Sequence, residues 1–188
     1  MDPYVYECWI DRLAGDYPGV AAVLVKFSSN LAITHMGKVM KIAMELDQFD
    51  HWVVGGHSLG GVVATTLVKK NPEFFEGAVM LASWSRESTD LSDWQGVVLS
   101  IYASEDLLAS KEEVESNKQY LPPGSQLETP VHFGDEQNHT YYYLLDGGNH
   151  SGFGCYGRQD GDGEALISSK EQQDEMIDIL TAYFNLLW

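Results

Sequence analysis

The chain has 188 residues, of which 44% are hydrophobic and 21% are charged. This length and composition favour one soluble globular domain with a core of its own and argue against a disordered chain. The formal net charge is −17 at pH 7, and so acidic a surface repels the phosphates of nucleic acids and of anionic lipids. We therefore expect neither of these among the partners.

No apolar run in the sequence approaches the ~18 residues that a membrane-spanning helix needs. The first residues, Met-Asp-Pro-Tyr, lack the basic start and the apolar stretch of a signal peptide. We therefore expect a soluble, cytoplasmic chain with no membrane span. The two cysteines, Cys8 and Cys155, lie far apart and match no metal-binding spacing, so we expect buried free thiols rather than a disulfide.

The first part of the chain alternates predicted helices with short apolar runs. In chain order it predicts a helix over 4–13, a strand over 20–27, a helix over 36–44, a strand over 52–54 and a helix over 59–70. The helices carry apolar residues at helical spacing, as in Met36, Val39 and Met40. The strand runs are rich in Val and mostly do not alternate with polar residues, which is typical of strands buried on both faces.

The second part continues the alternation. It predicts strands over 78–82, 97–102 and 141–145, a helix that Ser110 and Glu113 cap, and a last helix that Ser168 and Glu171 cap. Long irregular stretches cover 84–95, 121–139 and 147–165, and loops of that length are usually functional or disordered. The whole pattern predicts an α/β fold over residues 1–188, with a mostly parallel central sheet and helices on both faces.

The sharpest motif is Gly-His-Ser-Leu-Gly at residues 56–60, between a predicted strand and a predicted helix. This is a G-x-S-x-G nucleophile elbow, in which a strained turn raises the hydroxyl of Ser58 above the edge of the sheet. We expect side chains two residues before or after the serine to collide with the turn, and Gly61 to let the helix pack closely. The N–H of Leu59 then becomes the first oxyanion-hole donor. The alternative is that the glycines only make a turn.

A serine hydroxyl needs a base, which an acid orients, and this motif predicts the chain order serine, acid, histidine. His150 follows the predicted strand 141–145, and the glycines before it let the loop turn back toward Ser58. His139 precedes that strand, so we expect it at the wrong end of the sheet, and His132 is a weaker third candidate.

The acid is expected just after the predicted strand 97–102, where Glu105 and Asp106 stand side by side. Neighbouring side chains diverge, so only one of them can face the histidine. We prefer Asp106, and the alternative is that both are solvated loop carboxylates. The acidic, glycine-rich segment 160–164 lacks the length and spacing of a calcium loop, so we expect a solvated turn. His57 has no second ligand at helical spacing, and we expect no metal and no cofactor.

Three stretches together resemble the alpha/beta-hydrolase superfamily, near its dienelactone-hydrolase and lipase-like branches. Residues 51–61 read HWVVGGHSLGG, residues 99–106 read LSIYASED, and residues 146–154 read DGGNHSGFG, continuing through Tyr156 and Gly157 to GDGE at 161–164. The resemblance spans nearly the whole chain. It implies the same triad of Ser58, Asp106 and His150.

The resemblance also implies two departures from the superfamily. The nucleophile strand normally comes fifth, whereas here it is the second predicted strand, so the chain is expected to lack its first strands and the loop with the second oxyanion donor. The strand 20–27 would then be an exposed edge. Either the chain is a fragment of a longer one, or a partner or a second copy covers this edge. The stretch 121–139 is longer than usual, and a surface flap and an added hairpin both remain open.

These observations favour a serine hydrolase that cleaves an ester-like bond of a small molecule through an acyl-enzyme. We expect the substrate pocket to draw on loop residues after the strands, namely Asn30, Leu31, Trp84, Leu107 and Phe153. The alternative is a weak or inactive hydrolase-like binding domain, because a second oxyanion donor is missing. Dienelactone hydrolysis through a cysteine is disfavoured, because a serine holds the elbow.

Overall fold

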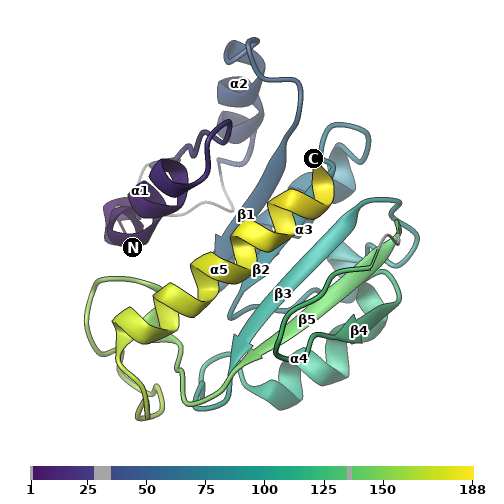
Figure 1. Ribbon diagram of the computed structural model, residues 1–188. Coiled ribbons are helices and arrows are strands. Elements are labelled where there is room, and N and C mark those ends of the chain that lie inside the picture. Colours follow the sequence, from purple (N-terminus) through teal and green to yellow (C-terminus); the bar gives the residue numbers. More distant parts are fainter. Residues whose placement is uncertain (1, 28–34, 135–136) are drawn as a thin grey trace.

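The structure, a computed structural model, describes residues 2–27, 35–134 and 137–188. A sheet of parallel strands forms the centre of the molecule (Figure 1). In this part of the chain the strands are β1 (Val53–His57), β2 (Gly77–Leu81), β3 (Val97–Ala103), β4 (Gly124–Gln126) and β5 (His139–Leu145). Their order in the sheet is β1-β2-β3-β5-β4, and every pairing between them is parallel. The predicted α/β fold with a mostly parallel sheet is confirmed.

Helices cover both faces of the sheet. The helices are α1 (Glu7–Asp16), α2 (Gly37–Glu45), α3 (Leu59–Lys70), α4 (Lys111–Asn117) and α5 (Ser169–Leu187). Alternate residues of each strand point to opposite faces, so Leu81 of β2 packs in the core under α1 and α5, while its neighbour Met80 packs under α3 and α4. Strands with both faces buried explain why the predicted runs were continuously apolar.

The two predicted capping boxes are confirmed. At the start of α4 the N–H of Glu113 donates to the hydroxyl of Ser110 over 3.3 Å, and the Glu113 carboxylate accepts from the N–H of Ser110. Ser168 and Glu171 make the same exchange at the start of α5. Each cap satisfies backbone N–H groups that have no acceptor within the helix.

The predicted strand over 20–27 is wrong, because this segment has no regular secondary structure. A strand needs a neighbouring strand to accept and donate its backbone hydrogen bonds, and no described strand pairs with this run. Val23 is 44% exposed, so the run is not the buried strand that its apolar composition indicated. Within the described residues β1 pairs only with β2, and the expected open edge of the sheet lies at β1 instead.

The long stretch 121–139 is neither a simple flap nor a hairpin in its described part. It contains β4, a short strand that lies parallel to β5 with Gly124 opposite Thr140. A hairpin requires antiparallel strands, so this stretch extends the sheet by a parallel edge strand. It lies at the opposite end of the sheet from β1.

The prediction of two free thiols is wrong. Cys8 in α1 and Cys155, which follows the last described strand, form a disulfide with their Cα atoms 6.5 Å apart. Their separation of 147 residues along the chain hid the pairing from the sequence. The two cysteines meet because α1 packs beside the loop that follows β5.

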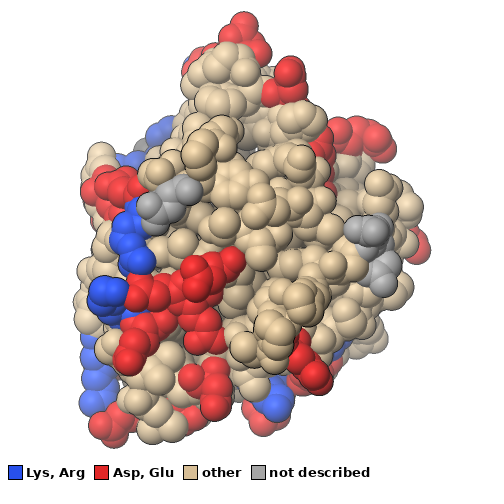
Figure 2. Space-filling view, in the orientation of Figure 1, with Lys and Arg blue, Asp and Glu red and all other residues tan. Residues whose placement is uncertain are grey.

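The surface shows the acidic excess of the sequence. In Figure 2 acidic atoms form a patch over the part of this face that α5 crosses, with Lys and Arg atoms beside it. Asp174 of α5 pairs with Arg12 of α1 over 2.6 Å and with Lys170. Among the described helices, none combines the length and the hydropathy that crossing a bilayer demands.

Candidate active site

The three residues expected to carry the chemistry all follow the carboxyl ends of strands. Ser58 follows β1, Asp106 follows β3 and His150 follows β5. Carboxyl ends of parallel strands share one edge of the sheet, and ligands of open α/β sheets bind outside that edge. The topology therefore gathers the three residues, although 92 positions separate Ser58 from His150.

The turn at Ser58 is strained. Ser58 has φ 55° and ψ −125°, a left-handed backbone conformation that residues other than glycine rarely adopt. Its N–H donates to the carbonyl of Leu81 over 2.9 Å, and its carbonyl accepts from the N–H of Gly61 at the same distance. These backbone bonds hold the turn between the sheet and the first turn of α3, and Ser58 remains partly exposed.

The predicted steric requirement for glycine holds at some positions of the elbow and not at others. A Cβ at Gly56 would overlap the backbone of Gly60, so position 56 requires glycine. A Cβ at Gly61 would lie 2.5 Å from the side chain of Ser83, so this position also requires glycine. The expected collision at Gly60 itself is wrong, because a Cβ there would meet no atom within 4 Å outside its own helix turn. Gly60 matters through its backbone, which fills the space beside Gly56.

Asp106 and His150 form a buried pair. An Asp106 carboxylate oxygen lies 2.8 Å from Nδ1 of His150, and the two residues are 2% and 1% exposed. The other Asp106 oxygen accepts the N–H groups of Leu108 and Ala109 over 2.8 Å and 2.7 Å. The carboxylate is therefore held on one side by backbone and orients the imidazole on the other. Glu105 turns away, since its carboxylate accepts the Ser104 hydroxyl over 2.9 Å.

The loop of His150 is fastened by Asp162, which is 6% exposed. One Asp162 oxygen accepts the N–H of His150 over 3.2 Å, and the other accepts the N–H and the hydroxyl of Ser151 over 2.8 Å and 2.6 Å. The prediction of a solvated turn over 160–164 is therefore wrong at Asp162. The segment packs against the histidine loop, and its Asp162 carboxylate is the acceptor for the N–H groups of His150 and Ser151.

Gln172 of α5 fastens the same loop from the other side. Its side chain accepts the N–H of Asn149 over 3.1 Å and donates to the carbonyl of the same residue over 2.9 Å. Gln172 is 1% exposed, so both bonds are shielded from water. Neither Asp162 nor Gln172 was predicted, because no short-range pattern joins them to the histidine. The glycines that flank Asp162 were the one available signal that its backbone approaches another segment.

His57 lies between the serine turn and the histidine loop. Its ring lies 4.4 Å from the ring of His150 and stacks on Phe153 at 5.5 Å, centroid to centroid. The hydroxyl of Tyr6 lies 2.9 Å from Nδ1 of His57. Burial, followed by the nearby His150, lowers the pKa of His57 to about 3, so this ring is neutral at pH 7. Burial raises the pKa of Tyr6 to about 12, so its hydroxyl keeps the proton that it can donate to His57.

Ser58 and Leu59, the predicted nucleophile and oxyanion donor, both lie at the surface. Leu59 is 48% exposed and is the first residue of α3, where a backbone N–H has no acceptor within the helix. Among the described residues, no hydrogen bond joins Ser58 Oγ to the imidazole of His150. Such bonds often form only when substrate is bound.

The remaining candidates are distributed around the fold. His139 is the first residue of β5, opposite Val97, and so lies at the amino end of the strand as expected. His132 is exposed and borders a hollow beside β4, away from the histidine loop. Of the expected pocket residues, Trp84 is partly buried, Leu107 is 69% exposed and Phe153 is fully buried, while Asn30 and Leu31 lie outside the described residues. Phe153 is stacked against His57, and its assignment to the pocket stays a prediction.

Solved structures share the fold at low sequence identity. An esterase from Thermogutta terrifontis aligns with 100% of this chain and 86% of its own, at 10% identity and a TM-score of 0.63. A monoacylglycerol lipase from Paleococcus ferrophilus aligns with 97% of this chain and 90% of its own, at 13% identity and a TM-score of 0.60. No curated protein matches the sequence.

Some similar structures are considerably longer than this chain. A predicted CIB-like hydrolase from Thermoplasma acidophilum aligns with 79% of this chain at 13% identity and a TM-score of 0.50, and the alignment spans 59% of that protein. The family model described as "Alpha/beta hydrolase family" matches residues 1–174, which is most of the sequence. The chain therefore belongs to the alpha/beta hydrolase family.

Proposed function

We propose that this chain is a serine hydrolase that cleaves an ester-like bond through an acyl-enzyme. The observation that carries the proposal is the buried contact of 2.8 Å between Asp106 and His150, at the same sheet edge as the strained turn of Ser58. Backbone strain and a buried carboxylate–imidazole pair are both costly to maintain, and both are common at catalytic sites. Family membership supports hydrolysis as the class of reaction.

The mechanism assigns one role to each of the three residues. Nε2 of His150 removes the proton of the Ser58 hydroxyl while Oγ attacks the carbonyl carbon of the ester. The imidazolium then gives that proton to the leaving alkoxide, which departs as an alcohol and leaves an acyl-Ser58 ester. A water molecule attacks this ester in the same way, with His150 again as base, and releases the acid. Asp106 holds the imidazole through Nδ1 and stabilises its charged form throughout.

The carbonyl oxygen becomes negative in both tetrahedral intermediates. The N–H of Leu59, at the positive end of α3, supplies one hydrogen bond to that oxygen. Each such donor contributes about 10²- to 10³-fold to the rate in related chemistry. The rate of this chain therefore depends strongly on whether a second donor joins Leu59 when substrate is bound.

Ester-like substrates are favoured over other acyl compounds by the similar proteins. The similar structures include one named as an esterase and one named as a monoacylglycerol lipase. The partly buried Trp84 and the exposed Leu107, each after a strand end, would offer apolar surface to a small acyl group. Short-chain esters are therefore the first substrates to examine.

The first prediction tests this proposal directly. We expect a fluorophosphonate probe to label purified protein at Ser58, and p-nitrophenyl acetate to be turned over. Ser58→Ala should abolish the labelling and lower kcat by at least about 10³-fold, because no other group can form the acyl-enzyme. Mass spectrometry of the labelled peptide and steady-state kinetics measure both effects. Ser83→Ala, a serine after β2, is the matched control and should keep the label.

The experiment also separates the alternative of an inactive binding domain. A protein with an intact melting transition that is neither labelled nor active would overturn the hydrolase proposal. Labelling without turnover would mean that Ser58 is activated but that acyl transfer to water fails. Asp106→Asn distinguishes these cases further, because it should reduce the rate of labelling by about 10²-fold or more if the acid orients His150.

A further inference from the structure

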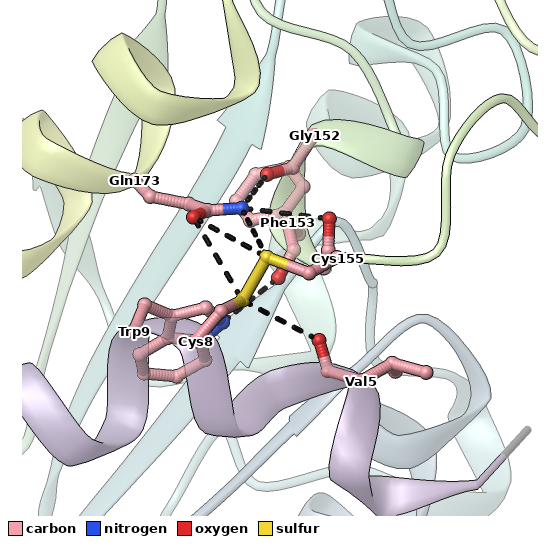
Figure 3. Close-up of a disulfide and its surroundings, with 8 residues drawn as sticks. Val5, Cys8, Trp9, Gly152, Phe153, Cys155 and Gln173 are labelled. Carbon is pink, nitrogen blue, oxygen red and sulfur yellow. Dashed lines mark hydrogen bonds between the residues drawn. A yellow bond between two sulfur atoms is a disulfide. The ribbon is translucent and has the colours of Figure 1, made fainter.

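The N-terminal segment, residues 3–13, is fastened to the loop that carries His150. The disulfide between Cys8 and Cys155 joins α1 to a position five residues after the histidine. Figure 3 shows this bond above α1, with the side chain of Gln173 beside it. Both cysteines are exposed, so a thiol in solution can reach the bond.

Hydrogen bonds surround the disulfide and join the same two segments. The N–H of Cys155 donates to the carbonyl of Val5 over 2.8 Å. The indole N–H of Trp9 donates to the carbonyl of Phe153 over 3.0 Å (Figure 3). Gln173 of α5 donates to the carbonyl of Gly152 over 3.0 Å. Residues 152–155 are thus held between the N-terminal segment and α5.

The N-terminal segment also reaches the serine turn. Tyr6 stands two residues before Cys8, and its hydroxyl lies 2.9 Å from Nδ1 of His57. The rings of Tyr6 and His57 meet edge to face at 5.8 Å, and His57 also contacts Phe153 and His150. One short segment therefore contacts both the residue before the nucleophile and the loop of the base.

From these contacts we infer that Tyr6 is a positioning residue for the reaction, and that the Cys8–Cys155 disulfide keeps it in position. This inference rests on the proposed hydrolase function. Tyr6 fixes the ring of His57, and His57 in turn supports one face of the His150 imidazole. The disulfide prevents the loop at 155 from moving away from the N-terminal segment, so hydrolysis depends on the oxidation state of the two cysteines.

Reduction would loosen this arrangement without unfolding α1. A dithiol transfers two electrons and two protons to the bond, which yields the thiols of Cys8 and Cys155 and a cyclic disulfide of the reductant. Trp9 and Leu13 are 6% and 5% exposed in the main core, so α1 stays attached through apolar packing. Reduction breaks the covalent bond that keeps the segment of Tyr6 close to the loop of His150. Displacements of about 1 Å in a catalytic group cost up to about 10²-fold in rate.

The test compares one protein in two oxidation states. We expect reduction with dithiothreitol to lower kcat for p-nitrophenyl acetate about tenfold, with KM changed less than about threefold, and reoxidation to restore kcat. The variant Cys8→Ser with Cys155→Ser should match the reduced protein and ignore the reductant. Thiol titration confirms reduction, and a melting curve confirms that each form is folded at the assay temperature.

Tyr6→Phe tests the contact through which the tether acts. It keeps the ring and removes the hydroxyl, and we expect kcat to fall about three- to tenfold at unchanged KM, with a smaller further effect of reduction than in the unmodified protein. Tyr17→Phe is the matched control, because Tyr17 directly follows α1 and its hydroxyl donates to Asn185 on α5, away from His57. Its kcat should remain unchanged.

The outcomes distinguish this inference from the proposed function. Equal kcat in the oxidised and fully reduced protein would overturn the positioning role and leave the hydrolase proposal intact. A dithiol effect that persists without either cysteine, or a Tyr6→Phe enzyme with unchanged kcat, would overturn it as well. An oxidised, folded protein that neither labels nor turns over substrate would instead overturn the hydrolase proposal, and with it this inference.

Discussion

The serine turn and the histidine loop meet at one edge of the sheet, yet they are held in different ways. The serine turn spans residues 56–61 and is fixed by backbone atoms of its own strand, its own helix and the neighbouring β2. The histidine loop spans residues 147–155 and is fixed by side chains that lie elsewhere in the sequence. The contacts that stabilise the serine turn are mostly between residues close in sequence, whereas those that stabilise the histidine loop come from residues far away in the sequence.

This difference has a consequence for substitution. A change in the serine turn acts on backbone sterics, so its effect is large at a tight position such as Gly56 and small at an open one such as Gly60. A change around the histidine loop removes one of several side-chain bonds, so its effect is graded.

The largest effect is expected from Gly56→Ala. The added Cβ would overlap the backbone of Gly60, and relieving the overlap must move either β1 or the start of α3. We expect a loss of about 4 kcal/mol in the free energy of unfolding, together with loss of fluorophosphonate labelling. Chemical denaturation followed by circular dichroism measures the stability.

Gly60→Ala is the matched control for this prediction. A Cβ at Gly60 meets nothing outside its own helix turn, and alanine favours a helix over glycine by about 1 kcal/mol. The variant should therefore be as stable as the original protein or slightly more stable. If Gly56→Ala and Gly60→Ala behaved alike, the account of the turn as one tight backbone contact would be wrong.

A smaller effect is expected from Asp162→Ala in the histidine loop. The variant leaves the N–H of His150 and both donors of Ser151 without their acceptor in a buried site. An unsatisfied buried donor costs about 1 to 3 kcal/mol, and some loop relaxation will reduce the sum, so we expect about 3 kcal/mol. Activity should fall by about tenfold, because the loop is looser but Asp106 still holds the imidazole.

Asp160→Ala serves as the control, since Asp160 is exposed in the same acidic segment. Its effect on stability should stay within about 0.5 kcal/mol, as for most surface substitutions. Denaturation curves and steady-state kinetics of the two variants provide the comparison. Equal effects at 160 and 162 would mean that the segment acts only through its overall charge, against the hydrogen bonds seen here.

The two regions also differ in how far the sequence could predict them. The serine turn follows a five-residue motif between a strand and a helix, so Ser58 and its surroundings could be predicted from adjacent residues. Chain order and strand ends also predicted that His150 and Asp106 lie at one edge of the sheet, where the structure pairs them. Gly60 was assigned a false reason, because which backbone fills the space beside Gly56 depends on three-dimensional packing that spacing alone does not contain.

The supports of the histidine loop could not be predicted, for a physical reason. Tyr6, Cys8, Asp162 and Gln172 reach it from three separate segments, and each contact forms only after those segments have packed. The same reasoning explains the run 20–27, whose composition suits a strand but which has no described strand to pair with. Hydrophobic pattern predicts which elements form, whereas partners of single polar side chains follow from the assembled fold.

The smallest effect is expected at His57, where the two regions touch. Burial lowers its pKa to about 3 from the ordinary 6.5, so below pH 6.5 the unfolded chain binds a proton that the folded chain does not. The stabilisation from neutral His57 is therefore complete above pH 6.5 and decreases as the pH falls toward 3. The loss is about 1.4 kcal/mol for each pH unit below 6.5, or about 2 kcal/mol at pH 5.

His57→Phe keeps an aromatic ring on Phe153 but does not titrate. Its stability at pH 7 should fall by about 1 kcal/mol, because the bond with Tyr6 is lost. Between pH 7 and pH 5, however, the variant should lose about 2 kcal/mol less than the unmodified protein. Denaturation midpoints of both proteins, measured across this pH range, give the difference between their stabilities. The titration of surface carboxylates contributes equally to both proteins and so cancels in this difference. Parallel pH profiles would mean that His57 opens to solvent often enough to take up its proton in the folded state, and that the serine turn and the histidine loop are not sealed against each other.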